Sequence, residues 1–121
     1  MNELTEAEEY NNKGLIKARQ KDYQKAIEYF TKALKLEPDN EYAYISRGDT
    51  KCDLNNYSGA IQDYNKAIKL NPNNEISYCN RGRAKANLEN FQGALKDYNK
   101  SIELNPNLPI TYYHIGNVKY M

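Results

Sequence analysis

Four glycines recur in this 121-residue chain at one fixed spacing, Gly14, Gly48, Gly82 and Gly116. A constant period of about 20–50 residues is the signature of a repeat array, in which each copy buries its apolar face against its neighbours. Other rows keep the same period: Tyr10/Tyr44/Tyr78/Tyr112, Ala26/Ala60/Ala94, Phe30/Tyr64/Tyr98 and Pro38/Pro72/Pro106. We therefore expect stacked copies of one unit, with function on the surface that they share.

The pattern resembles the tetratricopeptide repeat, a helix–turn–helix unit with aromatic, small, alanine and proline positions at fixed offsets. Tyrosine replaces the early tryptophan of the family, and Lys17, Lys51, Lys85 and Lys119 replace a large aromatic residue. The resemblance implies an all-α fold, an α-solenoid of antiparallel helix pairs wound as a right-handed superhelix of seven helices. Residues 1–121 would form a single array, with repeats at 7–40, 41–74 and 75–108 and a partial repeat at 109–121.

Local signals place the helix ends. Thr5 and Glu8 form a capping-box pattern, so the first helix should begin near Glu6. Pro38 ends the second helix, because proline cannot continue a helix and disfavours it in the preceding residue. Translation by one repeat then predicts helices at Glu6–Gln20, Gln24–Leu36, Glu41–Leu54, Ser58–Leu70, Glu75–Leu88, Gln92–Leu104 and Pro109–Tyr120.

Small residues and paired charges indicate how the helices pack. Close approach of two helices needs a missing or very short side chain, so we expect the Gly14 row to cross the Ala26 row within each pair. Ala33, Ala67 and Ser101 should allow the same approach between one pair and the next. Arg47 and Arg81 are each followed sixteen residues later by an aspartate, Asp63 and Asp97, which predicts ion pairs with a structural role.

Composition argues against several functional classes. The chain has 17 basic and 16 acidic residues and a net charge of +1, which does not favour nucleic-acid binding. No signal sequence and no segment long enough to span a membrane is apparent, so we expect a soluble, cytoplasmic protein. Cys52 and Cys79 lack Cys or His neighbours at metal spacing, which predicts reduced thiols, no metal site and no cofactor.

No set of residues in the sequence predicts catalysis. His114 is the only histidine, and no Ser or Cys is placed for activation by it. The glycines are isolated within predicted helices and do not form a phosphate-binding loop. We therefore expect a binding protein and not an enzyme.

The resemblance implies that the first helix of each repeat lines a concave groove, which binds extended peptides or partner helices. Counting from the glycines predicts an exposed inner stripe that includes Ile45 and Cys79. Asp49 is expected to face Arg83 across neighbouring helices, giving a groove of mixed charge. The candidate peptide-binding residues are Asn11, Asn12, Tyr42, Ser46, Asp49, Ile76, Asn80, Arg83, Tyr113, His114 and Asn117.

Two subfamilies offer a comparison for this groove. Chaperone-binding relatives hold a peptide carboxylate with Lys, Asn and Arg from three first helices. The matching positions in this chain are Asn11, Leu15, Ser46, Ile76 and Asn80. None of them is Lys or Arg, so binding of a chaperone tail by that clamp is not expected. The row Asn12/Ser46/Asn80/His114 is instead similar to the asparagine ladder of arrays attached to O-linked sugar transferases, which supports contacts to a peptide backbone.

The leading hypothesis is a protein–protein interaction scaffold with a protein or peptide partner. A structural or self-assembly module, and a targeting arm of a larger protein, are the alternatives. The last helix carries Tyr112, Ile115 and Val118 without a second helix to cover them. This unpaired stripe predicts self-association through Leu108–Met121.

Overall fold

The computed structural model describes residues 3–119, which form seven helices and no strand. The all-α solenoid is confirmed, and the predicted helix ends are correct to within one residue. The predicted end at Tyr120 lies outside the described residues. The helices are α1 (Glu6–Arg19), α2 (Tyr23–Leu36), α3 (Glu41–Asp53), α4 (Tyr57–Leu70), α5 (Glu75–Asn87), α6 (Phe91–Leu104) and α7 (Pro109–Lys119).

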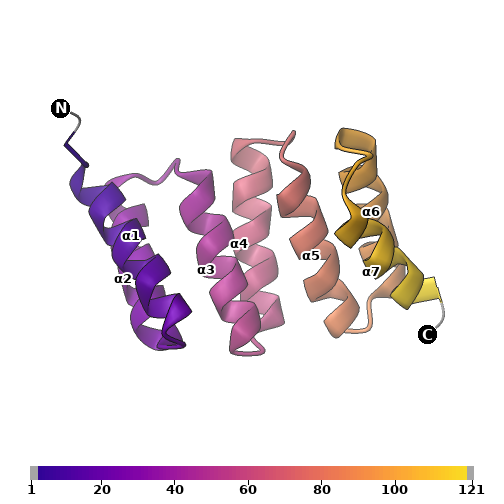
Figure 1. Ribbon diagram of the computed structural model, residues 1–121, viewed down its shortest axis with the longest axis horizontal. Helices are drawn as coiled ribbons and strands as arrows, with labels where there is room; N and C mark the ends of the chain where they lie inside the picture. Colours follow the sequence, from indigo (N-terminus) through magenta and orange to yellow (C-terminus); the bar gives the residue numbers. More distant parts are fainter. Residues whose placement is uncertain (1–2, 120–121) are drawn as a thin grey trace.

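Helices α1, α3 and α5 each pack against the helix that follows, and α2, α4 and α6 pack against the first helix of the next unit. Figure 1 shows the pairs side by side, with the two ends of the chain at opposite ends of the array. The first helices α1, α3, α5 and α7 also contact one another in that order, so together they form one surface. No helix within residues 3–119 has the length and hydropathy that a membrane crossing requires.

The turn inside each repeat is built the same way three times. Asp22, Asn56 and Asn90 each cap a second helix by accepting a hydrogen bond from the backbone N–H three residues later. The residue before each cap, Lys21, Asn55 or Glu89, has φ of 63°, 60° or 65° and closes the preceding helix. These caps explain why the second helices begin one residue earlier than expected.

The glycine row makes room for an aromatic ring, a contact that the sequence did not predict, and a Cβ at Gly82 would also lie 3.2 Å from the Ala94 carbonyl oxygen, as the expected approach to the alanine row requires. A Cβ atom at Gly14 would lie 2.6 Å from the Phe30 ring, and one at Gly82 would lie 2.6 Å from the Tyr98 ring. Gly48 stands in the same relation to Tyr64, at 2.8 Å. The rings of this aromatic row are buried and occupy the space that an additional side chain would need.

Small residues separate one pair from the next, as expected. Ala33, Ala67 and Ser101 are fully buried. Ser101 on α6 lies with its Oγ 3.4 Å from Oγ1 of Thr111 on α7. Short side chains on both sides of the contact therefore let successive pairs stack closely.

Both predicted Arg–Asp pairs are present. Nε and Nη2 of Arg81 donate to the two carboxylate oxygens of Asp97, at 2.8 and 2.7 Å. Nη1 of Arg81 donates to Asn65 Oδ1 of the preceding pair at 2.9 Å, so the guanidinium joins three helices. Arg47 makes the corresponding bonds to Asp63 and Thr31.

A lysine that the sequence analysis did not pair completes each of these clusters. Lys85 Nζ lies 3.0 Å from Asp97 Oδ2, and Lys51 Nζ lies 3.0 Å from Asp63 Oδ2. Each aspartate side chain is only 4% exposed, so its charge is balanced by two cations in a nearly buried position.

The predicted exposed stripe of α7 is partly covered. Tyr112 is half exposed, but Val118 is buried in a cluster with Ala94 and Tyr98, and Ile115 packs against that cluster. Among the described residues, no other helix and no side chain beyond the chain neighbours of Gly116 lies within 4 Å of a Cβ placed at Gly116. The open part of the stripe is thus smaller than expected, and self-association through this helix stays a prediction.

Candidate functional site

Two pockets lie between successive first helices. The α3–α5 pocket, of about 380 Å³, is lined by Asp49, Cys52, Asp53, Tyr57, Tyr64, Asn80, Arg83, Ala84 and Asn87. The α5–α7 pocket, of about 250 Å³, is lined by Arg83, Ala86, Asn87, Tyr98, His114, Asn117 and Val118. Arg83 and Asn87 belong to both linings, so the pockets adjoin and form a continuous surface that we call the groove.

The two pockets are the same place in successive repeats. Moving forward by one repeat carries Tyr64 to Tyr98, Asn80 to His114 and Ala84 to Val118. The charged positions change in this step. Arg83 takes the place of Asp49, and Asn87 takes the place of Asp53. One backbone geometry therefore carries two different sets of charges.

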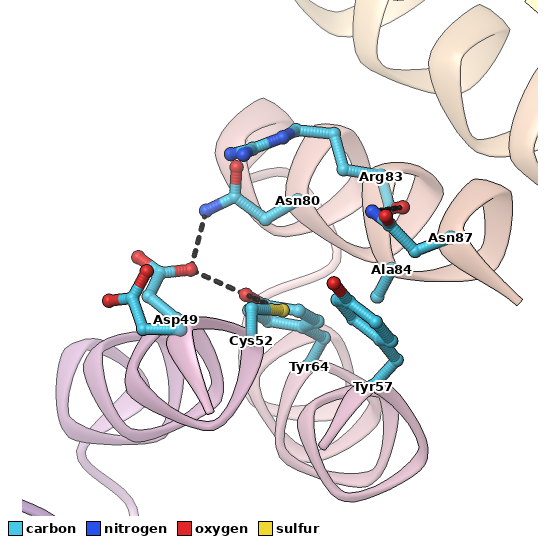
Figure 2. Close-up of a pocket in the computed structure, with 9 residues that line it drawn as sticks. Asp49, Cys52, Tyr57, Tyr64, Asn80, Arg83, Ala84 and Asn87 are labelled. Atoms are coloured by element: carbon cyan, nitrogen blue, oxygen red, sulfur yellow. Dashed lines mark hydrogen bonds between the residues drawn. The ribbon is translucent and has the colours of Figure 1, made fainter. Parts of the chain in front are cut away.

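Asp49 is held in the α3–α5 pocket by hydrogen bonds from two helices. Its Oδ1 accepts from the Tyr64 hydroxyl at 2.5 Å and from Asn80 Nδ2 at 3.0 Å. Figure 2 shows these bonds and places the rings of Tyr57 and Tyr64, from α4, between α3 and α5. Arg83, which was expected to face Asp49 across the neighbouring helices, lines the same pocket. Among residues 3–119, no ion pair within 4.0 Å includes either residue.

Asp49 remains partly exposed to solvent, but partial burial of its carboxyl group raises its pKa above the usual 3.8, although the Tyr64 hydroxyl bond and the Arg83 charge act in the opposite direction. The folded state therefore holds a proton at Asp49 more tightly than the unfolded chain does. The free energy of unfolding therefore decreases as the pH rises from 3.8, the unfolded pKa, through the higher pKa of the folded state. Above the folded pKa this loss of stability is complete.

Asp49→Asn is accordingly expected to increase the free energy of unfolding at pH 7, because the amide removes the charge and retains an oxygen for the Tyr64 hydroxyl. The gain over the parent should shrink as the pH falls toward about 4, where the carboxylate becomes protonated. Chemical denaturation across this pH range measures both effects. Asp39→Asn, at an exposed turn, is the control and should show no such gain. A parent protein that is as stable as Asp49→Asn at pH 7 would contradict the assignment.

His114 forms part of the wall of the α5–α7 pocket. Its ring stacks on Tyr98 with centroids 5.7 Å apart, and the exposed ring of Tyr113 meets it edge-on at 5.6 Å. Burial, with a smaller contribution from Arg83, lowers the pKa of His114. Its Nε2 is buried and has no hydrogen-bond partner among the described residues. The imidazole is therefore neutral near pH 7.

Apolar side chains lie along the same helices. Tyr42 is 65% exposed and lines a third pocket, of about 430 Å³, together with Ile45 and Ile76. Tyr113 on α7 is 63% exposed. A ligand in the groove can therefore contact polar groups in the two pockets and apolar groups beside them.

The predicted residues are only partly brought together. Asp49, Asn80, Arg83, His114 and Asn117 line the two pockets of the groove, and Tyr42 and Ile76 line the third pocket. The remaining candidates lie outside these three pockets: Asn11 and Ser46 are half-buried, and Asn12 and Tyr113 are exposed.

Ile45 and Cys79 were expected to be exposed, and this was wrong. Both are buried. Each stands three residues before a glycine of the packed row, which puts it on the helix face that meets neighbouring helices. Cys79 accordingly accepts a hydrogen bond from the Thr111 hydroxyl at 3.4 Å.

The sequence analysis missed the contribution of the second helices, which supply Tyr57, Tyr64 and Tyr98 to the pockets. A signal was present in the aromatic row, where Phe30 is followed by Tyr64 and Tyr98. A buried tyrosine hydroxyl needs a partner, and Tyr64 finds it in Asp49. No group of three or more His, Cys, Asp or Glu residues that could hold a metal ion occurs in the described part of the chain.

Comparison with known proteins identifies the repeat. The family model described as "Tetratricopeptide repeat" matches residues 7–40 and 76–108, and the model described as "TPR repeat" matches residues 48–89. A search of the curated proteins gave no match.

Similar solved structures cover most of the chain. The first TPR of Spaghetti (RPAP3), bound to the HSP90 peptide SRMEEVD, is 28% identical; the alignment covers 94% of this chain and 90% of that one, with a TM-score of 0.92. The first TPR domain of human RPAP3 gives the same identity, coverage and TM-score. The Arabidopsis OM64 TPR domain is 25% identical, with 94% of each chain covered and a TM-score of 0.92.

Proposed function

Because the chain belongs to the tetratricopeptide repeat family, we propose that it is a protein-interaction scaffold that binds an extended peptide along the groove of α3, α5 and α7. The observation that carries this proposal is the pair of adjoining pockets at equivalent positions of successive repeats. A single closed pocket suits a small molecule. A series of equivalent pockets suits a polymer whose own units repeat along its length.

The polar groups of the groove suit an open peptide backbone. Asparagine can donate and accept hydrogen bonds at once, as a peptide unit requires. Asn87 donates its amide hydrogen to the Arg83 carbonyl at 2.9 Å and keeps its side-chain oxygen as an acceptor. A helical partner would satisfy its backbone internally and would gain less from these amides.

The similar domain bound to an HSP90 peptide supports peptide binding on this architecture. The chemistry of the groove differs, however, from a clamp for a terminal carboxylate. The clamp positions here are Asn11, Leu15, Ser46, Ile76 and Asn80, and none is cationic. We therefore propose recognition through the two pockets and not through that clamp. No catalytic step is part of this proposal.

The test begins with selection of binders from a random peptide library displayed on phage. For a selected peptide, Asn80→Ala and Tyr113→Ala should each weaken binding by about 1 kcal/mol or more, which is a loss of about fivefold in affinity. Titration calorimetry measures the loss. Gln62→Ala and Lys66→Ala, at exposed positions of α4, are the controls and should bind as the parent does. Unchanged binding by the Asn80→Ala/Tyr113→Ala double variant would move the site away from the groove.

A further inference from the structure

We propose that the groove selects peptides that carry a basic side chain and an acidic group in a fixed order, with the basic side chain in the α3–α5 pocket and the acidic group in the α5–α7 pocket. This inference rests on the proposed function, because it concerns the specificity of the same groove. It comes from the charges that change between two otherwise equivalent pockets.

The α3–α5 pocket has an excess of negative charge. Asp49 and Asp53 both line it, and Arg83 is the one cationic residue among its lining residues. The buried Asp63 and Asp97 each have an arginine and a lysine within 3.0 Å, whereas no ion pair of residues 3–119 includes Asp49 or Asp53. One carboxylate charge in this pocket is therefore not balanced by the protein.

The rest of the α3–α5 pocket favours a cation. Within residues 3–119, both hydrogen bonds to the Asp49 side chain go to Oδ1, and none goes to Oδ2. The Tyr64 ring lies next to Asp49 (Figure 2), and the half-buried Tyr57 ring lines the same pocket. Aromatic faces attract lysine and arginine side chains, and long basic side chains can pack their methylene groups against such rings.

The α5–α7 pocket has the opposite charge. Arg83 lines it, while the positions of Asp49 and Asp53 are now Arg83 and Asn87, so no carboxylate remains among the lining residues that the structure describes. Asn117 offers an exposed amide in the same lining. An acidic group can pair with Arg83 and accept a hydrogen bond from this amide.

The spacing of the pockets sets the spacing of the charges. Helices in contact lie about 8–10 Å apart, and an extended chain rises about 3.3 Å per residue. The basic and acidic residues of a bound peptide should therefore be about three residues apart. A peptide with only one sign of charge would leave one pocket with an unpaired charge, which disfavours it.

The experiment compares the sequences that phage selection recovers with the parent and with two variants. Peptides recovered with the parent are expected to hold Lys or Arg and Asp or Glu about three residues apart, in one constant order. Selection with the Asp49→Asn/Asp53→Asn variant should lose the basic residue and keep the acidic one. Selection with Arg83→Gln should lose the acidic residue and keep the basic one.

Binding of one synthetic peptide from the parent selection completes the test. Arg83→Gln should lower its affinity about tenfold, and replacement of the acidic residue in the peptide should add little to that loss. Asp39→Asn and Lys66→Gln, at exposed positions away from the groove, are the matched controls, and thermal melts check that every variant is folded.

Three results would overturn the inference, and they are distinguishable. Recovered peptides of one sign or of no charge would refute the charge order while leaving peptide binding in place. Peptides with both charges whose binding does not respond to the variants would place the charges elsewhere. Recovery of no peptide at all would refute the proposed function, and the inference with it.

Discussion

Gly82→Ala is expected to lower the free energy of unfolding by about 2–3 kcal/mol, although alanine is the better helix former. The added Cβ would lie 2.6 Å from the ring of Tyr98 and 3.2 Å from the carbonyl oxygen of Ala94. Tyr98 is buried and cannot turn away, so α5 and α6 must separate. Chemical denaturation measures the loss.

Gly116→Ala is the matched control. Gly116 belongs to the same glycine row, but no aromatic ring of the described residues lies within 4 Å of a Cβ placed there. This variant should be as stable as the parent or gain up to about 1 kcal/mol from helix propensity. Equal effects at Gly82 and Gly116 would show that helix propensity, and not the space taken by the ring, decides the outcome.

Asp97→Leu is expected to cost about 3–5 kcal/mol of stability, because it leaves Arg81 and Lys85 without their shared carboxylate in a nearly buried position. Hydrogen bonding to Asp97 raises the pKa of Arg81 in the parent, and without Asp97 this guanidinium still stays charged because arginine does not deprotonate in proteins. Arg81→Leu should cost less, because Lys85 still balances Asp97 and leucine restores the apolar residue of the family. Denaturation of the two single variants and of the double variant measures the difference.

The double-mutant cycle tests the pair itself. A coupling energy of about 1 kcal/mol or more between Arg81 and Asp97 is expected for residues that share two hydrogen bonds. Asp63→Leu and Arg47→Leu repeat the comparison in the preceding copy, where the same bonds occur. Independent effects at both pairs, or a larger loss for Arg81→Leu than for Asp97→Leu, would contradict this account.

The fold could be predicted from the sequence because several rows recur independently with one period. Glycine, alanine, aromatic and proline positions agree on the same unit, and caps such as Thr5 mark where a helix begins. The partner of the glycine row could not be read in the same way. Ala26 and Phe30 both recur at suitable spacings, and only the geometry of the crossing shows that the ring of Phe30 lies against Gly14.

The candidate site could be predicted only on the first helices. Helical periodicity places Asp49, Asn80 and Arg83 on one surface, and all three line the α3–α5 pocket. It does not show how far a neighbouring helix covers a residue, so Ile45 was assigned to the wrong face. The pairing of Lys85 with Asp97 did have a signal, because Lys51 and Asp63 repeat the same spacing.

The location of a bound peptide tests the central claim most directly. Titration of the ¹⁵N-labelled protein with a peptide recovered by phage selection maps the site by NMR chemical-shift changes. The account predicts that the largest changes fall on α3, α5 and α7, around Asn80, Arg83 and Asn117, with small changes on the exposed face of α4. Shifts confined to the second helices, or to the open face of α7 around Tyr112, would contradict it.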